Sequence, residues 1–399
     1  MKIRFKPFAL NKEEHPEELL ISELTNGFDL SLEPQAFGLA IKSYYSEPVS
    51  FGTYALHLSF YAVEDIDCLY IFTGRKQLRD IISLKKGDRY EKTFYQSVAE
   101  IIPRYHNTSY PVSHLFFSFA GDSLQNIKLE NCYASKDNTI TRIFLCGDST
   151  VTDQSCEIPY YPGACYSSWG QNLPAFLTSK VAVENQAHSG LTTESFRKEG
   201  HFDLVKKHIQ TGDYCLFQFG HNDQKLSHLL ANREYPSNLR RFIKEVRELN
   251  GIPVLVSPLT RNIWDKDHKY LDLLKEHAQA VDKVAKEENV PLIDLYNFSK
   301  DFILRNGKEK STGYFHLEDY THTNEYGSYL FASFISQRLS NLFPQVIVSK
   351  LPSCDFKPPA NLWDKLNKKN KKKVTNEEKE IFDQAEKSVD NLLQMIKQN

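Results

Sequence analysis

The spacing of hydrophobic residues divides the chain into two stretches. Up to about residue 140, apolar and polar positions alternate with a period of two, and polar turns separate the runs. In one such run, Tyr54, Leu56, Leu58 and Phe60 alternate with smaller or polar residues. This alternation predicts half-buried strands, because successive side chains of a strand point to opposite faces. Several short strands with regular turns predict a β-sandwich over residues 1–140.

Further strands are expected at 68–72, 94–102, 114–120 and 124–132. The last two are predicted to pair as a hairpin around the turn Gly121-Asp122-Ser123. A strand pattern rather than a helix follows this turn. We therefore interpret its three residues as a polar turn without a catalytic role.

From about residue 141 the pattern changes to strands that alternate with helices. Short apolar or β-rich runs occur at 143–146, 180–184, 214–219, 252–257 and 290–295. Helical periodicity occurs at 168–178, 193–209, 236–249, 270–288 and 324–342. This rhythm predicts an α/β domain over 141–345, with a parallel sheet between two layers of helices.

The remaining residues, 346–399, are expected to form a C-terminal extension. A lysine-rich run at 368–373 precedes Thr375 and Glu378, which match a helix capping box. Apolar residues then recur at helical spacing from Ile381 to Ile396. This pattern predicts an amphipathic helix that docks on the body of the protein or on a second copy, so a homo-oligomer is one expected arrangement.

Composition narrows the classes of protein to consider. The chain has 399 residues, of which 41% are hydrophobic and 25% charged, an ordinary composition for a globular protein. Its formal net charge of -2 argues against a nucleic-acid partner. Seven cysteines without a CxxC pair favour a reducing compartment. Because no apolar stretch approaches the length of a membrane span, we predict a cytoplasmic protein with no membrane contact.

The residues after the first parallel strand suggest nucleophilic chemistry. Gly147, Asp148 and Ser149 follow the run 143–146 directly, which places a hydroxyl at the carboxyl end of a strand. A serine there needs a base, a carboxylate that orients the base, and donors for an oxyanion. Taken alone, Ser149 would be interpreted as a helix cap, Gly190 as a turn glycine and Asn222 as an Asx-turn residue.

Four blocks of sequence lift these residues above such interpretations. They read GDSTVTDQ (147–154), SWGQNL (168–173), FQFGHND (217–223) and DYTHTN (319–324). The first and third blocks fall at expected strand ends, as does the glycine-containing segment 185–192, which we call the glycine block. The last block comes shortly before the final helix. In these blocks the sequence resembles the SGNH/GDSL hydrolase superfamily and its rhamnogalacturonan acetylesterase-like branch. The resemblance implies a three-layer α/β/α, flavodoxin-like hydrolase domain, preceded by a galactose-binding-like β-sandwich, with no metal or organic cofactor.

The resemblance also implies roles for individual residues. Ser149 would be the nucleophile, His322 the general base and Asp319 the carboxylate that orients His322. The backbone N–H groups of Ser149 and Gly190 and the side-chain amide of Asn222 would hold the oxyanion. Rival bases are His188, His221 and His316, and Glu318 is a rival for Asp319.

Four residues are candidate substrate contacts. Trp169 either packs near the site or offers a platform for a sugar, and His188 lies within the glycine block. His221, together with Asp148, is expected mainly to support the loops. Arg261 follows the fourth strand and either binds a saccharide or forms a surface salt bridge.

The predicted function is a carbohydrate O-acetyl esterase that acts on acetylated plant cell-wall oligosaccharides, either rhamnogalacturonan or xylan fragments. The glycine block reads His188-Ser189-Gly190-Leu191, whereas relatives often have paired glycines followed by arginine, which weakens the case for an acidic sugar. One alternative is a short-chain lipase-like or thioesterase-like SGNH hydrolase. The other is a carbohydrate-binding protein without catalytic activity.

Overall fold

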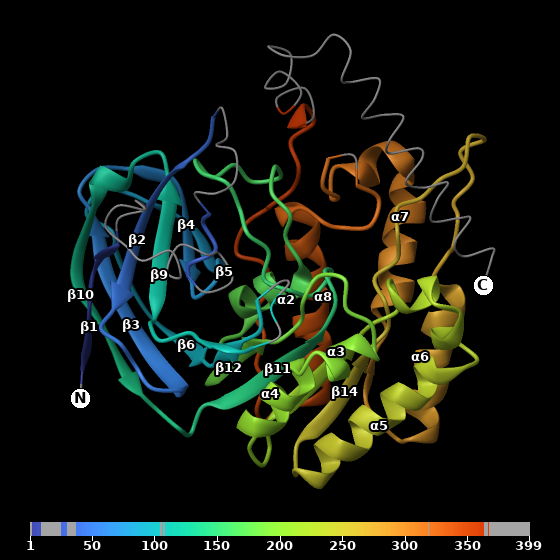
Figure 1. The fold of residues 1–399 in the computed structure, drawn as a ribbon. Coiled ribbons are helices and arrows are strands. Elements are labelled where there is room, and N and C mark those ends of the chain that lie inside the picture. Colours follow the sequence, from blue (N-terminus) through green and yellow to red (C-terminus); the bar gives the residue numbers. More distant parts are fainter. Residues whose placement is uncertain are drawn as a thin grey trace.

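The N-terminal third of the chain forms an antiparallel sheet, drawn in blue to cyan in Figure 1. The computed structural model describes residues 2–8, 25–29, 37–103, 106, 108–317, 319–362 and 366. Within these residues the eight-stranded sheet has the order β5-β4-β9-β2-β1-β10-β3-β6. Its strands are β1 (Ile3–Phe8), β2 (Ala40–Ser46), β3 (Gly52–Ala62), β4 (Ile66–Thr73), β5 (Gln77–Leu84), β6 (Arg89–Val98), β9 (Phe116–Gly121) and β10 (Ile127–Lys136); β7 (Glu100–Ile101) and β8 (Tyr110–Pro111) form a separate pair.

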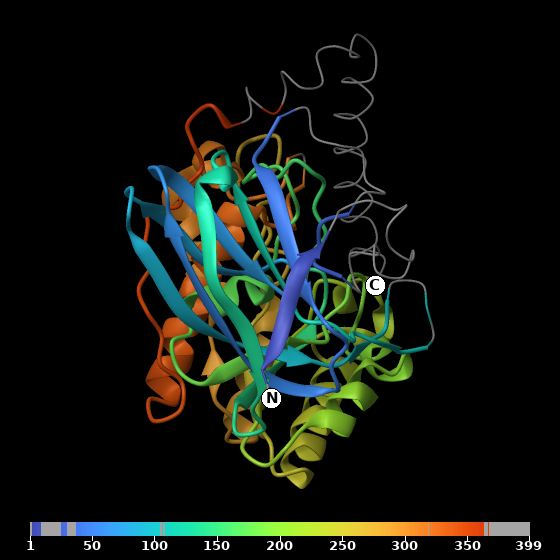
Figure 2. The same ribbon diagram turned by 90° about the vertical axis from the view of Figure 1, so that its left-hand side faces the viewer.

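The sheet encloses a core between its two halves (Figure 2). Strand β1 pairs with β2 along one part of its length and with β10 along another, so it joins the halves. Phe60 of β3 packs edge-to-face on Phe119 of β9 with ring centroids 5.3 Å apart, and both side chains are fully buried. The alternation of β3 therefore reflects one face that packs against strands of the opposite half.

The hairpin predicted around Gly121-Asp122-Ser123 is wrong. Strand β9 pairs with β2 and β4, whereas β10 pairs with β1 and β3, so the two strands lie in opposite halves of the sheet. A short 3₁₀ turn, η1 (Leu124–Asn126), redirects the chain between them. Leu124 is buried in the core of the sheet, which favours this crossing over a tight hairpin.

The second sheet is parallel and is built as the sequence predicts. Its strands are β11 (Thr141–Gly147), β12 (Val181–Asn185), β13 (Tyr214–Gln218), β14 (Ile252–Val256) and β15 (Leu292–Ile293), in the order β12-β11-β13-β14-β15. In β11, Ile143 and Leu145 face one hydrophobic core while Phe144 and Cys146 face another. Continuous apolar strands of this kind occur where helices cover both faces of a sheet.

Helices cover both faces of the parallel sheet (Figure 1). Helices α4 (His201–His208), α5 (Glu234–Glu248) and α6 (Lys275–Glu287) pack on one face, and α2 (Trp169–Asn172), α7 (Leu295–Thr312) and α8 (Glu325–Leu342) pack on the other. Shorter elements are α3 (Ser195–Lys198), η2 (Leu173–Phe176), η3 (Asp223–Lys225) and η4 (Ser227–Leu229). Strand β12 lies on one side of β11 and strand β13 on the other, so the direction of the chain connections reverses at β11. In folds of this type, ligands bind at the carboxyl ends of the strands at such a point.

Three helices differ from the predicted ranges. The helix expected over 193–209 is divided into α3 and α4 by Gly200, which adopts a φ of +88°. The helix expected from residue 270 begins only at Lys275. Helix α7 was not predicted, because its exposed and buried residues follow no strong helical period and Gly307 interrupts it with a φ of +70°. The amphipathic helix predicted after Thr375 and the lysine-rich run lie outside the described residues.

The turn between β4 and β5 reaches from the antiparallel sheet into the α/β part. Arg75 donates to the backbone oxygen of Asn185 at 2.7 Å and pairs with Asp153 at 3.4 Å. Lys76 pairs with Glu325 at the start of α8, at 3.6 Å. The two parts of the chain are thus joined by buried polar contacts close to the end of β11. No helix among the described residues has the length and apolar character needed to cross a membrane.

Candidate active site

The turn after β11 positions Ser149. A Cβ atom on Gly147 would lie 2.6 Å from Cγ2 of Val151 and 2.8 Å from the backbone oxygen of Gln218, so only glycine fits. The backbone oxygen of Ser149 accepts hydrogen bonds from Gln154 Nε2 at 2.7 Å and from Ser168 Oγ at 3.0 Å. Gln154 and Ser168, the residue that precedes α2, therefore fix the backbone that carries the hydroxyl.

Ser149, His322 and Asp319 form a continuous hydrogen-bonded chain. The Oγ atom of Ser149 lies 2.7 Å from Nε2 of His322, and Nδ1 of His322 lies 2.6 Å from Oδ2 of Asp319. The other carboxylate oxygen of Asp319 accepts the backbone N–H groups of Thr321 and His322 at 2.7 and 2.9 Å. With Asp319 on Nδ1, the ring presents Nε2 to the serine, which is the tautomer that a general base requires.

The environment keeps Asp319 ionised. Burial alone would raise its pKa, but the hydrogen bonds and charge of His322, together with the backbone donors, lower the pKa of Asp319 to about 2. The rival base His316 is elsewhere engaged, because its ring stacks on Tyr166 at 3.7 Å. Glu318, the rival carboxylate, lies outside the described residues.

The expected oxyanion donors come from three loops, which follow β11, β12 and β13. Asn222 donates from Nδ2 to the backbone oxygen of Leu191 at 3.0 Å, which ties the end of β13 to the glycine block. Gly190 is exposed and has a φ of +87°, which a side chain would disfavour. Among the described residues, the backbone N–H groups of Ser149 and Gly190 donate no hydrogen bond to another backbone oxygen.

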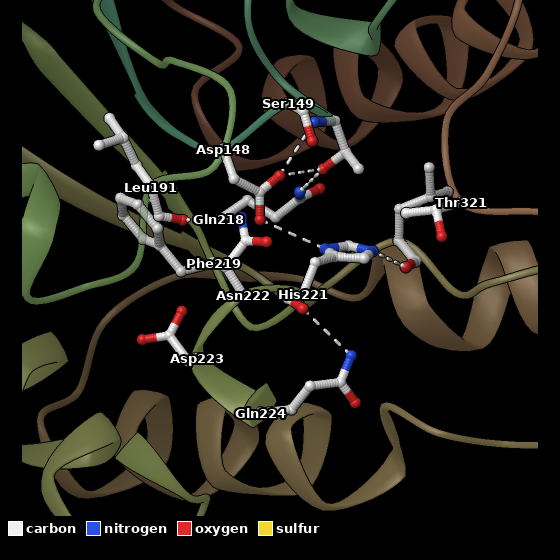
Figure 3. Close-up of polar contacts among 12 residues, drawn as sticks. Asp148, Ser149, Leu191, Gln218, Phe219, His221, Asn222, Asp223, Gln224 and Thr321 are labelled. Atoms are coloured by element: carbon white, nitrogen blue, oxygen red, sulfur yellow. Dashed lines mark hydrogen bonds and ion pairs between the residues drawn. The ribbon is translucent and has the colours of Figure 1, made fainter. Parts of the chain in front are cut away.

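Asp148 and His221 form a buried layer behind these residues (Figure 3). The Oδ2 atom of Asp148 lies 3.3 Å from Nδ1 of His221, and Nε2 of His221 lies 2.7 Å from the backbone oxygen of Leu259. The carbonyl of Leu259 places a ring proton on Nε2, so Nδ1 is the nitrogen that faces Asp148, and neither Nδ1 nor Oδ2 of Asp148 has a hydrogen-bond partner among the described residues. Burial opposes the ionisation of Asp148, but His221 and Thr150 lower the pKa of Asp148 below its ordinary value.

Arg261 belongs to this layer rather than to the surface. It is 4% exposed, and it donates to Thr321 Oγ1 and, at 3.0 Å, to the backbone oxygen of His221. The predicted surface salt bridge is therefore wrong, because burial hides the guanidinium from solvent. Saccharide binding by Arg261 is also disfavoured, because both terminal nitrogens of its guanidinium already donate hydrogen bonds to protein oxygens. The residue links the loop of Asn222 to the loop of His322.

Asp223, the residue after Asn222, connects the loop after β13 to the loop after β12. Its Oδ1 atom accepts from the backbone N–H and the hydroxyl of Thr193, at 2.9 and 2.6 Å, which ties the oxyanion loops together. Its Oδ2 atom is buried without a hydrogen-bond partner among the described residues. Burial raises the pKa of Asp223 to about 7, so this carboxyl group is largely protonated below neutrality.

The structure separates the remaining candidates. Trp169 is 1% exposed and donates from Nε1 to Gln218 at 2.8 Å, so it packs beneath the site and offers no platform to a sugar. His221 is also buried, which excludes direct contact with substrate. His188 is half-buried, with its ring 5.6 Å from that of His201, and it remains a candidate contact.

Two residues near the site were missed. Tyr166 is 39% exposed, and its ring lies edge-on to His322 at a centroid distance of 5.6 Å. Lys225 donates from Nζ to Oδ1 of Asn222 at 2.9 Å. Both lie within a few residues of a recognised block, so proximity in sequence was the available signal. Neither residue type is diagnostic there.

One buried cluster could hold a metal by residue type. The ligand atoms of Cys156, Cys165 and Glu325 lie within 4.8 Å of one another, the single such group in the described part of the chain. The ammonium of Lys76, 3.6 Å from Glu325, already supplies positive charge there. Burial also raises the pKa of the Cys165 thiol well above its ordinary value, which disfavours the thiolate that a metal binds. We assign no metal to this cluster.

The parallel sheet, the serine turn and the Asp-x-x-His segment define a serine hydrolase whose domain is of the α/β class. A family model for the GDSL-like lipase/acylhydrolase family matches residues 145–328, and the chain belongs to that family. It is 33% identical to rhamnogalacturonan acetylesterase RhgT of Bacillus subtilis (strain 168) over 214 residues, which are 50% of this chain and 90% of the relative.

Two further comparisons give the range of similarity. Probable rhamnogalacturonan acetylesterase YesY of Bacillus subtilis (strain 168) is 30% identical over 208 residues, covering 50% of this chain and 93% of the relative. The crystal structure of YxiM from Bacillus subtilis is similar over 76% of this chain and 82% of its own, with 21% identity and a TM-score of 0.48.

Proposed function

We propose that the protein is a serine esterase that removes O-acetyl groups from carbohydrates. The observation that carries the proposal is the chain of contacts from Ser149 through His322 to Asp319, with distances of 2.7 and 2.6 Å. The names of the two Bacillus subtilis relatives refer to rhamnogalacturonan. For this chain we propose acetylated plant oligosaccharides as the substrate class, with rhamnogalacturonan and xylan fragments both open.

The reaction follows from the positions of the side chains. Ser149 Oγ bonds to the acetyl carbon while His322 Nε2 takes its proton, and the carbonyl electron pair moves onto oxygen. When this pair returns, the bond to the sugar oxygen breaks and His322 protonates the leaving hydroxyl. A water molecule, deprotonated by His322, then attacks the acetyl carbon of the acetyl-serine. The bond from this carbon to Ser149 Oγ breaks, His322 returns the proton to Oγ, and acetate leaves.

The oxyanion is proposed to lie between the N–H groups of Ser149 and Gly190 and the amide of Asn222. Each donor of this kind lowers the barrier by roughly 3 kcal/mol, because it is oriented before charge develops. Support comes from the tie between Asn222 and Leu191, which holds the two loops at a fixed spacing.

For the sugar itself we propose Tyr166 in place of Trp169. Its ring is the exposed aromatic surface beside His322, and aromatic faces pack well on the apolar face of a sugar ring. His188 is the second proposed contact. We also retain three proposed regions: a galactose-binding-like β-sandwich over 1–140, the hydrolase domain over 141–345 and the extension over 346–399.

The cytoplasm remains the proposed compartment. The seven cysteines of the sequence include no CxxC pair, which suits a reducing compartment. The possible second copy of the chain stays a proposal, since the terminal helix that would mediate it lies outside the described residues.

The decisive experiment measures acetate released from acetylated xylo-, manno- and rhamnogalacturonan oligosaccharides, with p-nitrophenyl acetate and octanoate in parallel. Release from one glycan with little hydrolysis of octanoate is the expected result. Preference for octanoate would move the protein to the lipase-like alternative. Absence of turnover on every ester would favour the carbohydrate-binding alternative.

A further inference from the structure

Lys225 lies at the oxyanion site but has no role in the reaction as described above. It is the last residue of η3, the single turn that follows Asn222 at the end of β13. Its Nζ atom donates to Oδ1 of Asn222 at 2.9 Å. On the other side of the same amide group, Nδ2 of Asn222 donates to the backbone oxygen of Leu191 at 3.0 Å.

These two contacts determine which way the amide of Asn222 points. An ammonium group can only donate a hydrogen bond, and a carbonyl oxygen can only accept one. A flipped amide would set NH₂ against the ammonium of Lys225 and oxygen against the oxygen of Leu191. The observed orientation leaves the second N–H of Nδ2 for a substrate oxygen.

The charge of Lys225 bears on the same place. The side chain is half-buried, so its field is screened less than that of a surface lysine. The other charged groups around it are Arg261, Asp148 and Asp319, which come from the loops after β14, after β11 and before α8. Burial and Arg261 lower the pKa of Lys225, whereas the two carboxylates act in the opposite direction and do not offset the decrease.

We propose that Lys225 is a positioning residue of the oxyanion site, whose ammonium fixes the amide of Asn222 with its N–H directed at the reacting carbonyl and adds positive charge near the developing oxyanion. The inference rests on the proposed esterase function. It predicts an effect on the chemical step rather than on substrate binding, because the charge on the carbonyl oxygen appears only in the transition state.

Three substitutions of Lys225 separate the contribution of its hydrogen-bond donor from that of its positive charge. Lys225→Arg keeps both a donor and a charge, Lys225→Gln keeps a donor without charge, and Lys225→Met keeps neither at similar length. We expect kcat for an aryl acetate to fall about 10- to 100-fold in Lys225→Met, with KM nearly unchanged, and to fall less in Lys225→Gln. Lys225→Arg should restore most of the rate. Lys244→Met, which removes a lysine 77% exposed on α5, is the matched control.

The dependence of kcat on pH gives a second readout that a merely structural role would not change. The protonated ammonium is the active form, so the wild-type kcat should fall on the alkaline side, below the ordinary lysine pKa of 10.5. Lys225→Met should lack this alkaline decrease. If Lys225→Met fails to fold by circular dichroism, Lys225→Gln supplies the same comparison at neutral charge.

The outcomes separate the two proposals. If the wild-type protein hydrolyses no acetyl ester, the proposed function fails and Lys225 is not implicated. If the wild type is active and Lys225→Met keeps its kcat, changes only KM, or keeps the alkaline decrease, the role of Lys225 is overturned. A lower kcat with an unchanged KM and loss of the alkaline decrease would support it.

Discussion

The chain contains the tripeptide Gly-Asp-Ser twice, and the two copies have entirely different surroundings. At Gly147-Asp148-Ser149 the turn ends a parallel strand, Asp148 is fully buried, and the serine contacts His322. At Gly121-Asp122-Ser123 the turn ends an antiparallel strand, and Asp122 is exposed. Ser123 caps the short turn η1 without a side-chain hydrogen bond. The motif has chemical meaning only where strand ends from the same sheet surround it.

The largest expected effect separates the two serines. Ser149→Ala should lower kcat on the order of 10⁶-fold, because it removes the nucleophile of a concerted group. Its thermal stability should be close to that of the wild type, since the hydroxyl contacts only His322 in the described structure. Ser123→Ala should leave acetate release unchanged. Equal activity of the two variants in this assay would contradict the assignment of Ser149.

The next largest difference is expected between Asp148 and Asp122, in how much their substitution lowers the free energy of unfolding. Asp148→Ala removes the group that faces Nδ1 of His221 in the interior, and loss of one member of a buried pair costs about 3–5 kcal/mol in the free energy of unfolding. Asp122→Ala should change it by less than about 0.5 kcal/mol. Urea denaturation measures both.

Asp148→Asn refines this test. An amide can donate to Nδ1 of a neutral His221 while the ring still donates to Leu259, so this variant should retain most of the stability lost in Asp148→Ala. A loss as large as that of the alanine variant would show that charge, rather than hydrogen bonding, stabilises the layer.

The two glycines provide a smaller contrast. A methyl group on Gly147 would meet Val151 at 2.6 Å and a backbone oxygen at 2.8 Å, and such overpacking costs about 1–3 kcal/mol. On Gly121 the nearest atom, the backbone oxygen of Cys68, is 3.2 Å away, so Gly121→Ala should cost less. The midpoints of thermal unfolding of the two alanine variants should follow this order.

Asp223 shows what burial does to an aspartate that lacks a cation at hydrogen-bond distance. Its folded pKa of about 7 exceeds the unfolded value of 3.8, so the folded state binds more protons and stability falls as pH rises from 4 to 7. The full shift corresponds to at most roughly 4 kcal/mol. Asp223→Asn should therefore gain about 1 kcal/mol or more at pH 7 and gain nothing at pH 4. Denaturation at the two pH values measures the difference, and an equal effect at both would contradict the raised pKa.

Much of the catalytic geometry could be predicted, because parallel strands bring their carboxyl ends to one edge of the sheet. Knowledge of the strands after which Ser149 and Asn222 occur was enough to expect their proximity. Arg261 could not be placed in this way. Its partners are a hydroxyl and a carbonyl from segments 60 and 40 residues away, and no local pattern records such contacts.

The antiparallel part was harder for a related reason. Individual strands follow from alternation, but pairing depends on packing between distant residues. Strand β9 pairs with β2 rather than β10, and Leu124, between β9 and β10, enters the core that the two halves of the sheet share. Helix α7 was missed because its apolar residues follow no strong period.

The turn between β4 and β5 has a consequence for how this protein can be divided. Residues 137–140 look like a natural place to separate two modules, since the last antiparallel strand ends at Lys136 and the first parallel strand begins at Thr141. A fragment beginning there would nevertheless lose Arg75 and Gln77, the side chains that face the fully covered carboxylate of Asp153, four residues after Ser149. For recombination or engineering, the smallest portable unit is therefore the hydrolase together with its N-terminal sheet.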